Sequence, residues 1–158
     1  MYIPIPKSYV KEYFTIVALE DGLTVSLSDN ACEYCINDDG NWLSLDAGST
    51  TESINAGQTL LFRGNLTPNS SFGIGTFTIS KRCNLEGNCM SMLFGDNAAN
   101  NYSLSDKRSA FYMLFYNCKN ISAVELINND IVIGNNLCSL SFDINSTFSL
   151  SISIIGTC

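Results

Sequence analysis

The sequence predicts an all-β fold built as an antiparallel β-sandwich, and three observations support this prediction. Hydrophobic and polar residues alternate with a period of two in several short segments. Turn-forming Asn, Asp and Gly residues separate these segments at intervals of about 8 to 14 residues. The segments between residues 12 and 80 do not follow the 3.6-residue period of an amphipathic helix. Short strands at such spacing are typical of proteins in which two sheets pack face to face.

Residues 1–11 are expected to form an extended N-terminal arm. Pro4 and Pro6 fix their own φ angles and favour extended conformations in the residues before them. The first strand is expected over residues 13–18, which are aromatic and β-branched. Residues 23–28 alternate cleanly, so they predict a second strand with one hydrophobic face.

A hairpin is expected next. Residues 33–36 and 42–45 have the composition of strands, and the Asn, Asp and Gly residues at 37–40 between them form a strong turn signal. Two further strands are expected at residues 58–63 and 74–80. The expected sandwich therefore has about six strands.

The sandwich domain is expected to span residues 12–80. Its predicted core consists of the inward-facing hydrophobic residues Phe14, Val25, Leu27, Trp42, Leu43, Leu45, Phe62, Phe77 and Ile79. Trp42 is placed in this core because of its alternation with Leu43 and Leu45. A Trp42 that stacks on a ligand is the alternative.

Residues 81–158 are expected to form a second segment of different character. Residues 89–95 and 110–118 are short and apolar without β alternation, so each predicts a single helical turn. Residues 140–154 show the most regular alternation in the chain, with a break at Asn145-Ser146, and predict an amphipathic β tail.

Charge and composition argue against two classes of partner. The chain has eight Lys and Arg residues and a net charge of -7, whereas the phosphate backbone of nucleic acids requires clustered basic residues. The pairs Lys81-Arg82 and Lys107-Arg108 are too small for such a surface. No stretch reaches the ~18 consecutive apolar residues of a spanning helix. We therefore expect neither nucleic-acid binding nor membrane insertion.

The cysteines are interpreted as packed or unpaired thiols, with disulfides and a metal site as alternatives. The chain has seven: Cys32, Cys35, Cys83, Cys89, Cys118, Cys138 and Cys158. Their odd number leaves at least one thiol unpaired. Cys32 and Cys35 have C-x-x-C spacing, but they lie in an expected strand and not at the helix N-terminus that redox motifs use. Cys83 and Cys89 could complete a zinc site, although their separation is wide for one.

The sequence assigns no catalytic, cofactor-binding or metal-binding residue, and we expect no enzymatic activity. Without histidine, a serine nucleophile lacks its usual base. Residues 38–41 offer oxygen ligands but lack the remainder of a calcium loop. Residues 73–75 resemble half a phosphate loop but precede a strand instead of a helix. The carboxylates weighed as acid or base groups fall in expected turns or on an exposed strand face: Glu20, Asp21, Glu33, Asp38 and Asp39.

Several strings of residues carry a resemblance to a known family. They are YFTI at 13–16, LEDGLTVSLS at 19–28, CEY at 32–34, FRGNLTP at 62–68, GIGTFTISK at 73–81 and GNCMSMLFGD at 87–96. Together they resemble an immunoglobulin-like module of gut Bacteroidales and their phages, over roughly residues 12–125. In those proteins the module often precedes leucine-rich repeats of the BspA type. Residues 110–121 resemble the opening of one such repeat.

The resemblance implies an immunoglobulin-like sandwich over residues 12–80 and a role in surface display, adhesion or virion structure. The starting Met and the lack of a signal-peptide pattern favour a virion, because phage structural proteins need no export signal. We therefore expect a head fibre or capsid-decorating protein. A bacterial cell-surface adhesin, or a glycan- or protein-binding module, is the alternative.

The expected partners follow from the two ends of the chain and from its surface. The arm at residues 1–11 is expected to dock on a neighbouring capsid or virion subunit. Residues 139–158 are expected to mediate homo-oligomer formation, because the apolar face of this β segment must be covered. A surface glycan is the further partner considered. We expect no cofactor.

Overall fold

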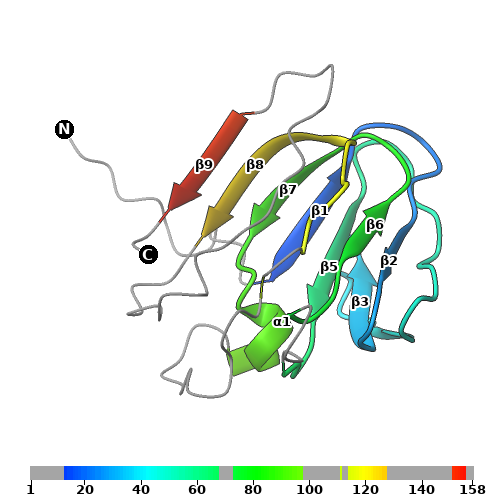
Figure 1. Cartoon of the computed structure of the whole chain (residues 1–158). Helices are drawn as coiled ribbons and strands as arrows, with labels where there is room; N and C mark the ends of the chain where they lie inside the picture. Colours follow the sequence, from blue (N-terminus) through cyan, green and yellow to red (C-terminus); the bar gives the residue numbers. More distant parts are fainter. Residues whose placement is uncertain (1–12, 68–72, 98–110, 112–113, 128–150, 156–158) are drawn as a thin grey trace.

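The computed structural model describes residues 13–67, 73–97, 111, 114–127 and 151–155 (Figure 1). Its regular structure is almost entirely β, which confirms the all-β fold class. The elements in chain order are β1 (Phe14–Ala18), β2 (Val25–Leu27), β3 (Cys32–Ile36), β4 (Leu43–Leu45), β5 (Thr59–Arg63), β6 (Phe77–Ile79), β7 (Cys83–Gly87), α1 (Ser91–Phe94), η2 (Gly95–Asn97), β8 (Ile121–Ile127) and β9 (Ser151–Ile155). Within the described ranges, neither helix is long and apolar enough to cross a membrane.

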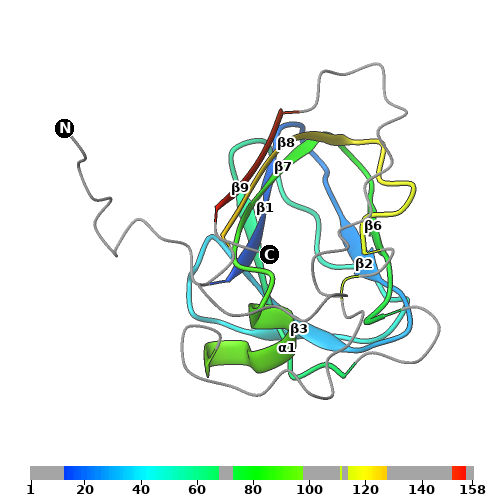
Figure 2. The same cartoon turned by 60° about the vertical axis from the view of Figure 1, so that its left-hand side comes forward.

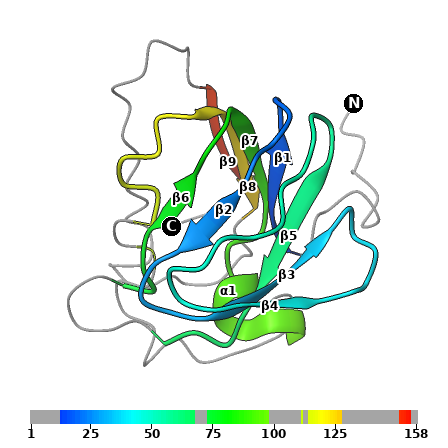
Figure 3. The same ribbon diagram turned by 90° about the vertical axis from the view of Figure 1, so that its right-hand side faces the viewer.

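Two sheets lie on opposite sides of the hydrophobic core (Figures 2 and 3). The larger sheet has seven strands in the order β4-β3-β5-β1-β7-β8-β9, and the smaller sheet consists of β2 and β6. Five of the first six strands fall inside the segments expected between residues 12 and 80, and β3 begins one residue before its expected segment. These six strands pair antiparallel. Asn37, Asp38 and Gly40 adopt positive φ in the turn between β3 and β4. The predicted hairpin is therefore confirmed.

The edge of the large sheet formed by β7, β8 and β9 is parallel, and it lies beyond residues 12–80, for which the antiparallel sandwich was expected. β8 pairs in parallel with β7, and β9 pairs in parallel with β8 (Figure 1). Parallel neighbours need a long crossover connection, and residues 88–120 provide it between β7 and β8. Because β7 also pairs with β1, the sheet continues past residue 80, where a boundary was expected.

The two predicted helical turns have different outcomes. Residues 89–95 contain α1, and the 3-10 helix η2 follows it directly. Of residues 110–118, positions 111 and 114–118 are described, and they form two backbone turns closed by the N–H of Leu114 on the carbonyl of Phe111 and the N–H of Cys118 on the carbonyl of Phe115. The rest of the second predicted helical turn lies outside the described residues. The carbonyl of Leu114 also accepts a hydrogen bond from the N–H of Phe77, which ties this segment to the edge of β6.

The terminal segments are described only in part. The arm expected at residues 1–11 lies outside the described residues, as does the break expected at Asn145. From the expected β tail at residues 139–158, only Ser151–Ile155 is described, and it forms the edge strand β9.

The core between the two sheets is built around an aromatic cluster. Phe14, Phe62, Phe77 and Phe115 are buried, and their ring centroids lie 5.3 to 6.0 Å apart in the contacting pairs. Such pairs contribute about 0.5–1.5 kcal/mol each beyond the burial of their area. Leu43 is partly buried against this core. The predicted core residues that the structure buries are Phe14, Val25, Leu27, Leu45, Phe62, Phe77 and Ile79.

Trp42 does not join the core, so its predicted place between the sheets is wrong. Its side chain is half-buried. Leu43 and Leu45 face inward, and the two-residue period of a strand therefore places Trp42 on the opposite face of the sheet. There it contacts Tyr13 and Arg63.

A buried serine joins α1 to the large sheet. The hydroxyl of Ser91 accepts a hydrogen bond from the N–H of Phe14 at 2.9 Å and donates one to the carbonyl of Phe62 at 2.7 Å. Phe14 and Phe62 are paired residues of β1 and β5, so this hydroxyl bridges their backbone groups. The N–H of Gly64 donates to the carbonyl of Ser91 at 2.9 Å. These bonds hold α1 against the end of β5.

Candidate functional site

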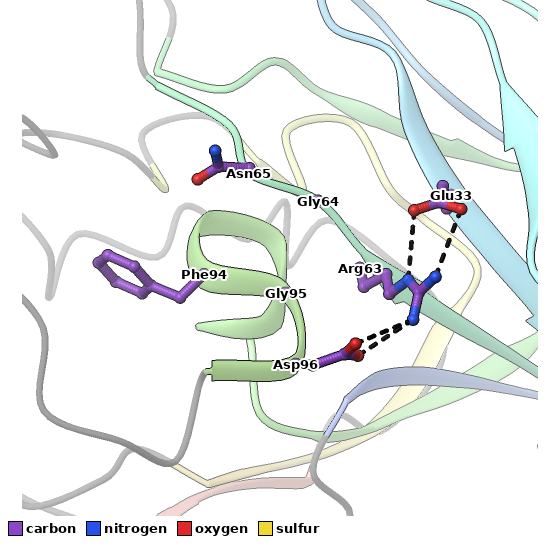
Figure 4. A pocket seen from close by; sticks show the side chains of 7 residues that line it. All are labelled: Glu33, Arg63, Gly64, Asn65, Phe94, Gly95 and Asp96. Atoms are coloured by element: carbon purple, nitrogen blue, oxygen red, sulfur yellow. Dashed lines mark hydrogen bonds and ion pairs between the residues drawn. The ribbon is translucent and has the colours of Figure 1, made fainter.

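Arg63 is the centre of a charged and aromatic cluster on the outer face of the large sheet. It is the last residue of β5 and lies directly opposite Glu33 of β3. Phe62 faces the core, so the two-residue period turns Arg63 outward. Its Nε lies 3.2 Å from Oε1 of Glu33, and its Nη2 lies 3.5 Å from Oε2 (Figure 4). This two-pronged arrangement matches the planar guanidinium to the planar carboxylate.

Asp96 approaches Arg63 from η2. The Nη1 atom of Arg63 lies 3.1 and 3.2 Å from the two carboxylate oxygens of Asp96 (Figure 4). The hydroxyl of Tyr13 donates a further hydrogen bond to Oδ1 of Asp96 at 2.7 Å. Tyr13 and Asp96 are 83 positions apart in the sequence, so only the folded chain brings them together.

Trp42 contacts both Arg63 and Tyr13, so these three side chains and that of Asp96 form a closed circle of contacts. The guanidinium carbon of Arg63 lies 4.1 Å from the centroid of the Trp42 ring, and that ring packs edge-on against Tyr13 at 4.9 Å. An exposed cation–π contact contributes about 0.5–1 kcal/mol. Tyr13, Glu33, Trp42, Arg63 and Asp96 are hereafter called the Arg63 cluster.

Electrostatic interactions keep Arg63 and Asp96 ionised. The hydrogen bond from Tyr13, together with the bond and charge of Arg63, lowers the pKa of Asp96 despite the opposing effect of burial. Burial lowers the pKa of Arg63, but Glu33 and Asp96 outweigh this effect and raise the pKa above its ordinary value. A general acid needs a pKa near the working pH. Asp96 is therefore not suited to that role at neutral pH.

A groove of about 410 Å³ opens beside the Arg63 cluster, between the end of β5 and α1. Its lining consists of Glu33, Arg63, Gly64, Asn65, Phe94, Gly95 and Asp96 (Figure 4). A second hollow of about 250 Å³ shares Glu33, Gly64 and Asn65 with it and extends toward Ser44 and Asp46. The two hollows thus adjoin along the end of β5. The volume of the larger one lies within the range of about 300–1,000 Å³ that small-molecule sites occupy.

Two glycines allow the walls of the groove to approach each other. A Cβ atom on Gly64 would lie 3.1 Å from both the Leu66 side chain and the carbonyl of Met92. Gly95 has a φ of +55°, a conformation that side chains disfavour. At these two positions the lining of the groove is backbone.

The carboxylates weighed from the sequence are spread over the molecule, and only Glu33 belongs to the Arg63 cluster. Glu20 and Asp21 each accept a hydrogen bond from a backbone N–H, at 2.8 and 2.9 Å. Asp39 accepts one at 2.8 Å within its own turn, and Asp38 lies in the same turn. In these positions they stabilise loops.

Residues 73–75 form a turn before β6. Gly75 has a φ of +118°, and a Cβ atom at this position would overlap the backbone of Ser28. The tight contact between two chain segments accounts for the glycine here. The resemblance to a phosphate loop is not accompanied by a helix, because the strand β6 follows.

The cysteines of the described residues are free thiols: Cys32, Cys35, Cys83, Cys89 and Cys118. Burial raises the pKa of Cys32, Cys83 and Cys89 to about 12, with a smaller contribution from the charge of Glu33 at Cys32. Such thiols stay protonated and are poor nucleophiles. This agrees with their interpretation as packed thiols. In the described ranges no three His, Cys, Asp or Glu side chains gather into a metal-binding group.

The groove is suited to recognition. It presents ionised carboxylates, a guanidinium, an amide and backbone groups, which together form a fixed array of donors and acceptors. The sequence assigned none of these residues to a site: Glu33 was weighed only as an acid or base group, and Tyr13, Arg63 and Asp96 were not singled out. The available signal was the alternation in β4 and β5, which turns Trp42 and Arg63 to the same outer face.

No protein-family model, no curated protein and no solved structure matches this chain. Its function is therefore argued from its own residues and their geometry.

Proposed function

We propose that this chain is a non-enzymatic structural protein of a bacteriophage particle. In this proposal it is a head fibre or a capsid-decorating subunit that displays an immunoglobulin-like β-sandwich. The observation that carries the proposal is the Arg63 cluster. On the surface of the large sheet it joins a Tyr, a Trp and an Arg to two carboxylates through hydrogen bonds, ion pairs and aromatic contacts. These three residue types are the most enriched among residues that dominate the energy of protein interfaces. The sequence resemblance to modules of Bacteroidales and their phages supports the same function.

The chemistry of the described residues supports a non-enzymatic role. The chain has no histidine. Glu33 and Asp96, the carboxylates at the groove, are both engaged by Arg63. The buried thiols have pKa values raised far above neutrality. General acid–base and nucleophilic catalysis both require a group whose pKa is tuned toward the working pH.

A virion protein also needs contacts with its neighbours. In this proposal residues 1–11 dock on a capsid neighbour, and residues 139–158 contribute to self-association. In the described part of the chain, β9 is the last strand of the large sheet and has a strand neighbour on one side. An edge strand offers backbone N–H and C=O groups to another strand, which supports the second contact.

Mass spectrometry of purified virions tests the proposal directly. We expect peptides of this chain in particles that have been banded on a density gradient, at a constant ratio to the major capsid protein. Host cytoplasmic proteins measured in the same fractions control for contamination. Absence of the chain from infectious particles would reject the virion function.

A bacterial cell-surface adhesin or binding module of the BspA leucine-rich-repeat type is the second candidate. The groove beside the Arg63 cluster favours it, because a polar hollow of ligand size is what such a module requires. The genes around the coding sequence separate the two candidates. Capsid and tail genes favour the virion protein, whereas outer-membrane and polysaccharide-use genes favour the binding module.

A further inference from the structure

We infer that the groove beside the Arg63 cluster binds a saccharide, through paired hydroxyl groups that bridge Arg63 and its two carboxylate partners. The inference rests on the second candidate function, a surface-binding module, and names the class of ligand for its site. It starts from the charge order along the groove, in which Arg63 stands between Glu33 and Asp96 (Figure 4).

The alternating charges select a neutral polar ligand. A cationic ligand that enters the groove meets the guanidinium of Arg63 at its centre, and an anionic ligand meets Glu33 and Asp96. The two carboxylates and the guanidinium carry a net charge of -1, so an anionic ligand is repelled, whereas a cation is drawn to the carboxylates against the opposing charge of Arg63 between them. A neutral ligand whose groups both donate and accept hydrogen bonds is complementary to all three side chains. A hydroxyl group has this property.

The hydrogen-bonding capacity of the three side chains exceeds what they use with one another. An ionised carboxylate has about four acceptor positions, and a guanidinium has five N–H donors. Glu33 receives two hydrogen bonds from Arg63, and Asp96 receives two from Arg63 and one from Tyr13. One hydroxyl can therefore donate to a carboxylate while the adjacent hydroxyl accepts from Arg63. Two hydroxyl groups on adjacent carbons of a sugar ring are close enough together to make both of these bonds.

The three charged side chains are accessible from solvent. The side chain of Asp96 is 63 % exposed, that of Glu33 is 45 % exposed, and that of Arg63 is 23 % exposed. Arg63 is held in place by the Trp42 ring in addition to its two ion pairs. A ligand therefore meets groups that are already oriented, which reduces the entropy lost on binding.

The remaining lining fits a saccharide better than a peptide. Asn65 is exposed and adds an amide that both donates and accepts. Gly64 and Gly95 contribute backbone to the lining, and Phe94 is the one aromatic residue among the lining residues. Peptide binding sites depend on desolvated apolar pockets for anchor side chains. The largely polar lining of this groove does not provide such a pocket.

The experiment uses the full chain on a microarray of defined glycans and purified bacterial polysaccharides. Binding to the strongest array hit is then titrated through the fluorescence of Trp42, the only tryptophan, which contacts Arg63. The groove variants are Asp96→Asn and Asn65→Ala. Their matched controls are Asp38→Asn and Asn55→Ala, which lie in loops away from the groove lining. Circular dichroism verifies the fold of each variant.

We expect at least one saccharide to bind, and each groove variant to raise the dissociation constant of that saccharide at least about tenfold. Asp96→Asn removes a hydrogen bond to a charged group, and Asn65→Ala leaves a ligand hydroxyl without its amide partner. The control variants should bind as the wild type does. A saccharide that binds the wild type and the groove variants equally would reject this groove and leave the binding-module function standing. If no glycan binds, or only peptides of a parallel peptide array bind, the saccharide inference is overturned. Detection of the chain in virions is independent of either outcome.

Discussion

Replacing Ser91 with alanine tests a fully buried polar contact of the fold. Ser91 is fully buried, and its hydroxyl bridges the backbone N–H of Phe14 and the backbone carbonyl of Phe62 at 2.9 and 2.7 Å. The variant Ser91→Ala removes the hydroxyl and keeps the helix-compatible backbone. It leaves one donor and one acceptor without this partner in the interior of the protein.

The expected loss follows from the cost of unsatisfied buried groups. Each such group costs about 1–3 kcal/mol. Two groups, partly relieved by small backbone shifts, give a loss of about 2–4 kcal/mol in the free energy of unfolding. For a domain of this size the loss corresponds to a decrease of roughly 4–16 °C in the melting temperature. The loss is a large share of the 5–15 kcal/mol by which native domains are typically stable.

Urea denaturation followed by Trp42 fluorescence and by far-ultraviolet circular dichroism measures the effect. Ser53→Ala is the matched control, because Ser53 is exposed, and it should change stability by less than about 0.5 kcal/mol. A loss below 0.5 kcal/mol for Ser91→Ala would refute the reasoning. It would mean that β1 and β5 close the gap and form a direct bond between Phe14 and Phe62.

Four further predictions concern other parts of the molecule. Gly75→Ala should cost more than about 2 kcal/mol, because its positive φ and its contact with Ser28 both oppose a side chain; a melting temperature near that of the wild type would contradict this. Asp96→Asn should lower stability at neutral pH by less than about 1 kcal/mol, since the ion pair is exposed. Because the folded pKa of Asp96 is lowered, its contribution is present above the ordinary carboxyl pKa and is lost as the pH falls through the lowered value, so urea titrations of variant and wild type should converge in acid; a constant difference from pH 7 to pH 3 would contradict this. Cys89, with a pKa of about 12, should react with iodoacetamide at pH 8 at least about a hundredfold more slowly in the native protein than in urea, as site-resolved mass spectrometry can show; equal rates would mean that the thiol is exposed. Deleting residues 139–158 should reduce the mass measured by light scattering from an oligomer to a monomer; a full chain that is already monomeric at micromolar concentration would assign this segment to its own sheet.

Local patterns predicted the strands well because strand formation depends on neighbouring residues. Alternation and turn chemistry located the six strands before residue 80 and the hairpin at residues 37–40. The same local rules located the helical turn at α1. They failed at Trp42, which was assigned to the core by its alternation with Leu43 and Leu45 although it directly precedes the inward-facing Leu43. Applied consistently, the two-residue period would have placed Trp42 on the outer face.

In the candidate site, what the sequence predicts and what only the folded structure shows are separated more clearly than in the strands. Glu33 was recognised as a carboxylate on an exposed strand face, but its partner depends on the register between β3 and β5. The contact between Tyr13 and Asp96 depends on how α1 and η2 close against the end of β5. A contact between residues so far apart in the chain forms only after many other contacts have offset the entropy of closing the loop. The local composition around Tyr13 or Asp96 therefore does not predict their contact.

By itself the sequence determined the β class, the positions of the early strands, most of the core and the absence of histidine chemistry, because these follow from composition and from short-range periodicity. Only the tertiary structure decided that β7, β8 and β9 run parallel, that Ser91 bridges two strands, and that Arg63 gathers its cluster beside a groove. The physical reason is that strand direction, register and loop closure are settled by long-range packing. An alternating segment pairs equally well in several of these arrangements until the rest of the core selects one.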